Sequence, residues 1–393
     1  MAGIYLHIPF CRQACHYCNF HFSTSLRHRN DFVPALLKEM ESRADYLANA
    51  PVDTVYFGGG TPSLLDPDDL AGIVDRIGRL FALSADAEVT LEANPDDMTA
   101  RGRVRDWRSA GINRLSIGVQ SFFEEDLRWM NRAHNAAQAE DAIRLAGEEG
   151  IDDLSIDLIY GGPTLPDRHW EANVTRAIAW RIPHISCYAL TVEPRTALDS
   201  LIRAHRVRDV DTGDQARQFL LLMEWMEKAG YEQYEISNFA RPGRRSRHNS
   251  SYWRGVPYLG LGPSAHSFDG KSRQWNVANN AAYLEAMEAG RPAVEEREWL
   301  TPVQQLNEYI MTSLRTLEGL DLGSVDRRFG RSAAAGLLER AGRYIAGGKM
   351  VKTANLVLTT EGKLLADGIA ADLFFSDGGG GREDIGPPAQ PRG

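Results

Sequence analysis

The chain has 393 residues, of which 43% are hydrophobic and 25% charged, as in an ordinary globular protein with room for more than one domain. Its formal net charge of −9 argues against a general nucleic-acid binder, because such proteins are usually basic. No apolar run approaches the ~20 residues that span a bilayer, and the N-terminus lacks the features of a signal peptide. We therefore expect a cytoplasmic protein without a transmembrane segment.

Short apolar runs alternate with amphipathic stretches along the first half of the chain. The runs, which predict strands, are GIYLHIP, DTVYFGG, EVTLEA, NRLSIGVQ, DDLSIDLIYG and HISCYAL. The stretches between them predict helices over about 31–50, from Pro67 after an N-cap at Asp66, over 136–149 and over 167–180. This alternation predicts an α/β fold with parallel strands, arranged as a partial (β/α)6 barrel related to the TIM barrel.

Polar residues stand near the ends of three predicted strands. Glu92 lies at the end of EVTLEA, Gln120 ends NRLSIGVQ, and Asp157 lies in SIDLIYG. Because active sites of such barrels form at the carboxyl ends of the strands, these residues predict a functional site at that edge.

The chain changes character after Thr212. TGDQARQFLLLMEWMEKAGY is typical of an apolar helix, and a basic loop follows in RPGRRSRHNSSYW. Helices then dominate from an N-cap at Thr301, with one hairpin in KMVKTANLVLTTEG. We predict a barrel core over 1–212, a barrel extension over 213–294, a mainly helical, winged-helix-like domain over 295–375 and a disordered Gly- and Pro-rich tail over 376–393.

Three of the four cysteines, Cys11, Cys15 and Cys18, form a C-x3-C-x2-C motif after the first strand. Clustered cysteines in a reducing compartment indicate metal or redox chemistry rather than disulfides. A four-iron cluster normally takes four thiolates, so three would leave one iron open to an exchangeable ligand. Zinc is the alternative. The histidines that could complete a zinc site are His7, His16 and His21.

The cysteine motif, followed by FGGGTPS after the second strand, resembles the radical S-adenosylmethionine (SAM) superfamily. Over about residues 1–375 the chain resembles the HemN/HemW branch of this superfamily. The motifs that carry the resemblance are YLHIPFCRQACHYCNF, VYFGGGTPS, LEANP, GVQSF, NRAHN, SIDLIYGGP and GLGPSAHS. The resemblance implies that the three cysteines hold a 4Fe-4S cluster whose fourth iron binds the amino and carboxylate groups of SAM.

The resemblance also implies which residues contact SAM: Tyr5, Tyr17, Gly59, Gly60, Thr61, Glu92, Gln120, Arg132, Asp157, Ala189 and His266. Their chemistry is suitable, because carboxylates and amides bond hydroxyl and ammonium groups and arginine pairs with a carboxylate. Any one of the polar residues is equally well explained as a hydrogen-bonded group at a barrel rim. Their joint placement at successive strand ends favours a cofactor pocket.

Two functions occur in this branch. One is oxygen-independent coproporphyrinogen III oxidase, a radical SAM enzyme. The other is a heme chaperone, which passes heme to an acceptor that the resemblance implies to be a respiratory heme protein. The oxidase pattern is C-x3-C-x2-C-x-C, whereas position 20 here is Phe20, and we expect no room for the oxidase's N-terminal extension before the first strand. The sequence favours the chaperone, leaves a homodimer open, and keeps a radical SAM enzyme acting on a porphyrin as the alternative.

The segment RHNSSYW matches the H-N-x-x-Y-W motif associated with heme binding in the chaperone group. Heme iron takes His or Tyr as an axial ligand, so His248 and Tyr252 are the candidate ligands. Trp253 offers a flat apolar face, and Asn249 is placed to orient the loop. Four arginines suit the heme propionates, although a solvated surface explains them too: Arg241, Arg244, Arg245 and Arg247.

Overall fold

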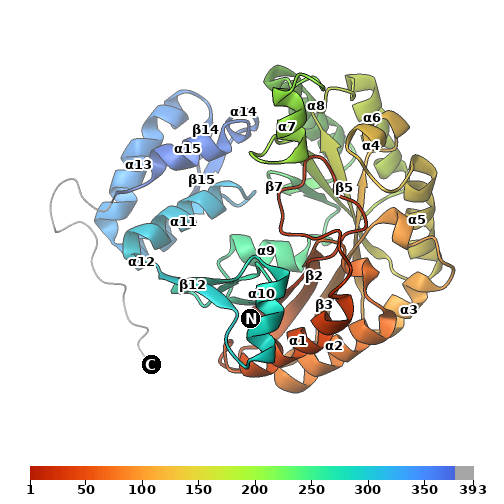
Figure 1. The fold of residues 1–393 in the computed structure, drawn as a ribbon. Helices are drawn as coiled ribbons and strands as arrows, with labels where there is room; N and C mark the ends of the chain where they lie inside the picture. Colours follow the sequence, from red (N-terminus) through yellow and green to blue (C-terminus); the bar gives the residue numbers. More distant parts are fainter. Residues whose placement is uncertain (377–393) are drawn as a thin grey trace.

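Six parallel strands form the centre of the molecule, which the computed structural model describes over residues 1–376 (Figure 1). They are β1 (Ala2–Ile8), β2 (Val52–Gly59), β3 (Leu83–Ala93), β4 (Arg114–Gln120), β5 (Asp153–Tyr160) and β6 (His184–Ala189). The predicted α/β fold with a partial barrel of six parallel strands is confirmed. The predicted tail lies outside the described residues, except for Ser376.

Shorter strands extend this sheet on both sides, in the order β12-β11-β10-β9-β1-β2-β3-β4-β5-β6-β8-β7. On one side, β9 (Tyr258–Leu261) is parallel to β1, and β10 (His266–Phe268), β11 (Ser272–Asn276) and β12 (Val294–Trp299) follow as antiparallel strands. On the other side, β8 (Asn238–Ala240) and β7 (Glu232–Glu235) are antiparallel additions. Since β12 and β7 are edge strands, the barrel remains open between them.

Helices cover the outer face of the parallel strands (Figure 1). They are α1 (Arg29–Ser42), α2 (Pro67–Leu80), α3 (Arg103–Ser109), α5 (Ala136–Glu148), α6 (Asp167–Ala179) and α8 (Thr212–Lys228). The short helices α4 (Glu124–Trp129) and α7 (Ala197–Arg203) belong to a separate hydrophobic cluster that includes Tyr17. The helix predicted over 31–50 ends at Ser42, and Ala48 and Asn49 beyond it have positive φ angles of 47° and 60°. Asp66 does stand at the N-cap of α2, but its side chain pairs with Arg29 at 2.9 Å instead of capping the helix.

A second hydrophobic core lies between Leu306 and Leu373. It is built from α11 (Pro302–Leu314), α12 (Leu322–Phe329), α13 (Arg331–Ala346), α14 (Thr360–Lys363), α15 (Ala366–Leu373) and a small sheet of β13 (Leu320–Asp321), β15 (Asn355–Leu358) and β14 (Met350–Lys352). The predicted hairpin and the capping by Thr301 are both present. β12 pairs with β11, so residues 294–299 belong to the large sheet.

The inner face of the parallel sheet is polar, unlike its outer face. Val55, Phe57 and Leu91 on the outer face are buried in the main hydrophobic core. On the inner face, strand register places one row of side chains side by side across five strands: Tyr5, Tyr56, Thr90, Arg114 and Asp153. The interior of this barrel is therefore lined with hydrogen-bonding groups.

A short helix, α9 (Arg247–Trp253), packs against the inner face of β1 and β2. Its His248 is 3% exposed and lies against Thr54 and Tyr56 of β2. The basic loop predicted near residues 241–253 therefore ends inside the barrel rather than on an open surface.

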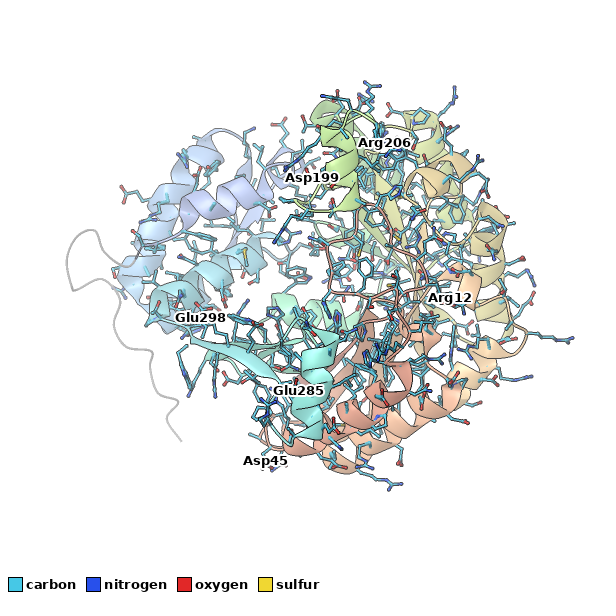
Figure 2. The ribbon with its side chains drawn as sticks, viewed as in Figure 1. Arg12, Asp45, Asp199, Arg206, Glu285 and Glu298 are labelled. Carbon is cyan, nitrogen blue, oxygen red and sulfur yellow. The ribbon has the colours of Figure 1, made fainter. Side chains whose placement is uncertain are left out.

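Charged side chains lie around the outside of the molecule. Figure 2 labels Asp45 at the lower edge of the molecule and Glu285 on α10 (Asn280–Glu288), and both residues are exposed, as is Arg206. Among the helices of residues 1–376, none is long and apolar enough to cross a membrane.

The barrel extension is joined to the core by one buried carboxylate. Glu39 of α1 is 1% exposed and accepts hydrogen bonds from the Gly262 backbone N–H (2.8 Å), Asn276 Nδ2 (2.6 Å) and the Tyr283 hydroxyl (2.7 Å). Gly262 and Asn276 border the β9–β11 region, and Tyr283 lies on α10 (Asn280–Glu288). Glu39 thus holds three separate segments of the extension.

We predict that Glu39→Ala lowers the free energy of unfolding by about 3–5 kcal/mol, because it leaves three buried donors without an acceptor. Glu41→Ala, two residues along the same helix, removes only an exposed ion pair with Arg76 and should cost less than ~1 kcal/mol. Urea denaturation of both variants measures the difference. Equal destabilisation would contradict this role for Glu39.

Candidate functional site

The loop between β1 and α1, residues 9–28, carries the three cysteines across the carboxyl end of the sheet (Figure 1). It is tied down at several points by residues that are distant in sequence. His16 N–H donates to the Met130 carbonyl at 3.1 Å, the His16 carbonyl accepts from Leu198 N–H at 2.8 Å, and Asn131 Nδ2 donates to the Ala14 carbonyl at 2.7 Å. The segments after α4 and at the start of α7 therefore fix the position of the loop.

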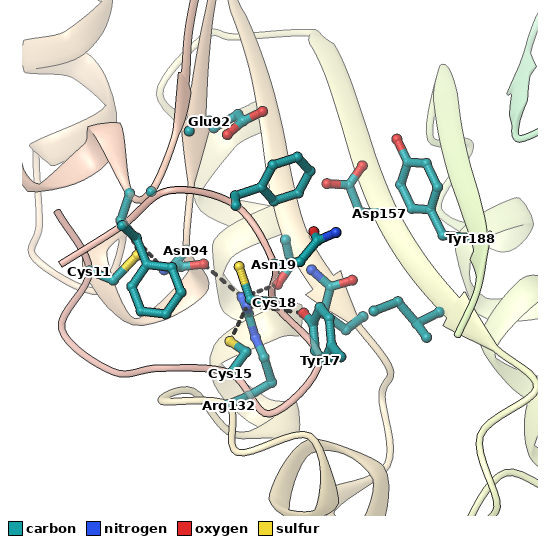
Figure 3. A pocket seen from close by; sticks show the side chains of 18 of the residues that line it. Cys11, Cys15, Tyr17, Cys18, Asn19, Glu92, Asn94, Arg132, Asp157 and Tyr188 are labelled. Atoms are coloured by element: carbon teal, nitrogen blue, oxygen red, sulfur yellow. Dashed lines mark hydrogen bonds between the residues drawn. The ribbon is translucent and has the colours of Figure 1, made fainter. Parts of the chain in front are cut away.

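Beneath this loop lies a cavity of about 440 Å³ (Figure 3). All three cysteines line it. So do nine of the eleven residues expected around a cofactor: Tyr17, Gly59, Gly60, Thr61, Glu92, Gln120, Arg132, Asp157 and Ala189. The strand-end rule used on the sequence thus brings residues from β2, β3, β4, β5 and β6 into one cavity.

Hydrogen-bond donors approach each of the three cysteine sulfurs. Thr61 Oγ1 lies 3.5 Å from Cys11 Sγ, Arg132 Nη1 lies 3.2 Å from Cys15 Sγ, and the Phe20 backbone N–H opposes the rise that burial causes in the pKa of Cys18. Burial raises the pKa of the Cys11 thiol to about 11, so a metal must displace its proton to bind there. Donors of this kind stabilise metal-bound thiolates.

No group of three or more Cys, His, Asp or Glu in residues 1–376 is arranged to hold a single metal ion. The nearby histidines bond to protein atoms: His7 Nε2 to the His21 carbonyl at 2.8 Å, His16 Nδ1 to the Trp129 carbonyl at 2.9 Å, and His21 Nε2 to Asn280 Oδ1 at 2.7 Å. The three cysteines share one cavity wall without a histidine among them, which suits a polynuclear cluster better than a closed zinc site.

The glycines after β2 allow two stretches of backbone to touch. A Cβ at Gly60 would lie 2.7 Å from the Phe10 carbonyl oxygen and 2.8 Å from that of Ile8. The Gly60 and Thr61 N–H groups donate to those same carbonyls, at 2.8 and 2.7 Å. The absence of a side chain at Gly60 thus lets the end of β2 lie against the cysteine loop.

Two of the three carboxylates that line the cavity, Glu92 and Asp157, resist ionisation. Burial raises the pKa of Glu92 to about 7, with repulsion from Asp157 adding to the rise and hydrogen bonds from Tyr56 and Gly59 opposing it. Burial raises the pKa of Asp157 to about 6, against the effects of Ser186 and two arginines. A cationic ligand would relieve the repulsion between them.

Arg132 joins the cysteine loop to the strand ends. Its Nη1 contacts Cys15, and its Nη2 donates to Asn94 Oδ1 at 2.7 Å and to the Gly118 carbonyl at 2.8 Å. Its Nε is buried and has no partner among the described residues. The guanidinium lines the cavity and presents a positive charge to it, which suits a ligand with an anionic group.

Backbone strain marks the same edge. Gln120, the last residue of β4, has a φ of 65°, a left-handed conformation that is uncommon for residues other than glycine. Strain of this kind clusters at functional sites, and Gln120 lines the cavity.

Two expected cofactor residues do not line the cavity. Tyr5 lies in the barrel interior, where its hydroxyl is 3.2 Å from His7 Nδ1 and its ring stacks on Tyr56. His266 is exposed on β10, and its ring lies 5.7 Å from that of Trp275.

Sequence reasoning missed several cavity residues: Asn94, Ser116, Gly118 and Tyr188. Asn94 follows Glu92 by two residues, so alternation along the strand end could have identified it. The same rule separates Cys187, 1% exposed in the core, from Tyr188, which points into the cavity beside Asp157 (Figure 3). Nothing in the sequence indicated that Tyr56 contacts Glu92, because a tyrosine in a strand is ordinarily a packing residue.

The four residues of the H-N-x-x-Y-W motif lie together on α9. His248 Nδ1 is 2.8 Å from Thr54 Oγ1, and its Nε2 is 3.0 Å from the Tyr252 hydroxyl, so both ring nitrogens are hydrogen-bonded. The Trp253 ring packs beneath Arg315 at 5.5 Å. Asn249 is half-buried near the start of the helix, where its N–H donates to the capping Ser246.

Three of the four neighbouring arginines are already paired. Arg245 bonds Glu232 and Glu318, Arg247 bonds the Asp86 carbonyl at 2.7 Å, and Arg244 bonds the Asp152 carbonyl at 2.9 Å. These contacts fasten the loop to the barrel, which explains their presence in an acidic protein.

Comparison with known proteins gives two family matches. A model described as the radical SAM superfamily matches residues 5–177, and one described as the HemN C-terminal domain matches residues 300–365.

Curated relatives extend over nearly the whole chain. "Heme chaperone HemW" of Bacillus subtilis is 33% identical over 372 residues, covering 93% of this chain and 97% of the relative. The protein of the same name from Mycobacterium tuberculosis is 36% identical, covering 95% and 94%. Among solved structures, coproporphyrinogen III oxidase (HemN) from Escherichia coli matches with a TM-score of 0.81 at 23% identity, covering 95% of this chain and 90% of that chain, and so shares its fold.

We predict that the cavity carboxylates make the cofactor-free protein less stable as pH rises. Folded Glu92 keeps its proton up to about pH 7, whereas its ordinary pKa is 4.5. The folded state therefore binds this proton more strongly, and stability falls through that window, by up to ~3 kcal/mol for this group. Glu92→Gln should flatten the fall between pH 5 and 8 in urea unfolding, while Glu41→Gln should not. Parallel pH profiles for wild type and Glu92→Gln would contradict the prediction.

Proposed function

The chain belongs to the HemN/HemW branch of the radical SAM superfamily, and from this membership we propose that it is a heme chaperone that binds heme and transfers it to an acceptor protein. The observation that carries the proposal is that relatives named heme chaperone align over more than nine tenths of the chain. The motif on α9, with His248 and Tyr252, supports it at the level of residues.

We propose that the cavity holds a 4Fe-4S cluster and SAM. Cys11, Cys15 and Cys18 would ligate the cluster, and the donors near their sulfurs suit bound thiolates. Such a cluster supplies electrons to SAM when both are bound. Within this chain, Glu92 and Asp157 would face the cationic part of SAM, and the Arg132 guanidinium on the cavity wall suits its carboxylate.

Heme, as cargo, would be held through the motif on α9. Burial lowers the pKa of His248 to about 3, with Arg114 adding to the effect, so the imidazole stays neutral at physiological pH. Neutral imidazole is the form that ligates metals. Axial ligation requires the ring to give up its bond to Thr54 or to Tyr252.

A radical SAM enzyme acting on a porphyrin is the second candidate. The complete cavity, with nine of the expected cofactor residues on its wall, favours it, because a simple heme carrier has no evident need for such a site.

We predict that replacing any one of Cys11, Cys15 or Cys18 by Ala abolishes the cluster after anaerobic reconstitution, because two thiolates do not hold a cubane securely. Phe20→Ala should leave it intact, since the contact to Cys18 is made by the backbone of residue 20. Iron, sulfide and visible absorbance measure the outcome. One zinc per chain without sulfide would refute the cluster.

We predict that the reconstituted protein, given SAM and a reductant, does not convert coproporphyrinogen III to protoporphyrinogen IX. Phe20, which stands where the oxidase pattern has a fourth cysteine, motivates this expectation. Porphyrin products are separated and quantified chromatographically. Robust protoporphyrinogen formation would place the enzyme ahead of the chaperone.

We predict that His248→Ala weakens hemin binding at least tenfold or changes the Soret band, since it removes an axial ligand. Cluster absorbance and SAM binding should not change. The control is His205→Ala, an exposed histidine outside the barrel interior. Transfer of heme to an apo-cytochrome is measured in parallel. If His248→Ala and Tyr252→Phe both bind and transfer heme as the wild type does, the heme site lies elsewhere.

A further inference from the structure

One side chain connects the cavity with His248. Glu92 forms part of the cavity wall, and its Oε1 accepts a hydrogen bond from the Tyr56 hydroxyl at 2.8 Å. The ring of the same Tyr56 side chain stacks on the His248 imidazole, with ring centroids 4.9 Å apart and ring planes at 21°. Tyr56 therefore touches both the cavity wall and the motif on α9.

Three contacts hold the His248 ring in the barrel interior, and the backbone N–H of this residue donates to Glu88 Oε1 at 2.9 Å. Thr54 and Tyr252 bond its two nitrogens, and Tyr56 covers one face of its ring. We call this arrangement the stowed position of His248. Because the ring is 3% exposed there, His248 cannot meet a macrocycle without leaving it.

We propose that Tyr56 couples the two sites: a ligand that engages Glu92 strengthens the stowed position of His248 and so weakens heme binding there. The heme consequence rests on the proposed function. The coupling itself rests on the Glu92–Tyr56–His248 contacts.

The physical basis is the Tyr56 hydrogen bond. A carboxylate accepts a much stronger hydrogen bond when it is ionised than when it is protonated. A cationic ligand in the cavity keeps Glu92 ionised, which strengthens the bond from Tyr56 and fixes the tilt of its ring. The ring stacks on His248 with its plane held at that tilt, so a stronger Tyr56 bond also stabilises the stowed position. Thermodynamic linkage then requires that heme bound at His248 lowers the affinity of the cavity for its ligand by the same factor.

The first test measures hemin affinity by Soret absorbance, with and without saturating SAM, in reconstituted protein whose cluster is not reduced. In the wild type, SAM should raise the Kd for hemin by about fivefold or more. In Tyr56→Phe, SAM should change the Kd for hemin by less than about twofold. Tyr46→Phe is the matched control, because its buried hydroxyl has no partner and it lies after α1, away from the inner face. A wild-type ratio near one, or an undiminished ratio in Tyr56→Phe, overturns the proposal.

A second variant separates the coupling from the stowed position itself. Thr54→Val removes the bond to His248 Nδ1 but leaves the Glu92–Tyr56 contact in place. It should tighten hemin binding about 2- to 10-fold, the net value of one hydrogen bond, and still respond to SAM. Unchanged or weaker hemin binding in Thr54→Val overturns the stowed position.

A third measurement needs no heme. In ¹⁵N-histidine-labelled protein, the His248 signals are assigned by their absence in His248→Ala. SAM should shift them in the wild type and in Tyr46→Phe, but not in Tyr56→Phe. If His248→Ala binds hemin normally, the proposed heme site fails, and this measurement alone then decides the coupling. Equal shifts in wild type and Tyr56→Phe overturn it.

Discussion

The site depends on a backbone contact that leaves no space for a side chain. Gly60 lies so close to the Ile8 and Phe10 carbonyls that a Cβ would overlap both, and two hydrogen bonds join the strands there. The β1–β2 pairing thus continues past the ends of the two strands. It fixes the backbone position immediately before Cys11. This contact therefore fixes the position of the start of the cysteine loop relative to Glu92 and Asp157. The contacts of the loop with Asn131 and Leu198 then fix its far side.

The barrel interior also holds a buried charge with few partners: Arg114 Nε lies 3.7 Å from Asp153 Oδ1, and its Nε and Nη2 make no hydrogen bond within residues 1–376. Arg114 is 2% exposed and stands in a row with Tyr56, Thr90 and Asp153. Its positive charge lowers the pKa of Asp157 and of His248 alike. Replacing buried charges by apolar side chains of similar volume is often neutral or stabilising in proteins. The polar interior is better explained by the two sites it connects, the cavity above and α9 below.

The sequence predicted the parallel strands well, because each strand is a short apolar run bounded by turn residues. It also located most of the cavity, because polar residues at strand ends meet at one edge: Glu92, Gln120 and Asp157 all line it. It failed where contacts between distant segments decide the outcome. Nothing local marks Tyr56 as a partner of Glu92, and the arginines near α9 resemble a solvated loop until Glu232, Glu318 and Asp86 are seen beside them. The sequence also did not show that α1 ends at Ser42, before the turn that contains Ala48 and Asn49.

The position of α9 also bears on why a heme-binding motif would be buried. When a binding residue is available only part of the time, the apparent affinity falls by the fraction of molecules in which it is available. A protein that keeps heme permanently gains nothing from this loss. A carrier does gain, because it has to release heme to its acceptor. The bonds of His248 to Thr54 and Tyr252 and the pairing of Arg245 with Glu232 and Glu318 are therefore more consistent with a carrier than with a permanent heme protein.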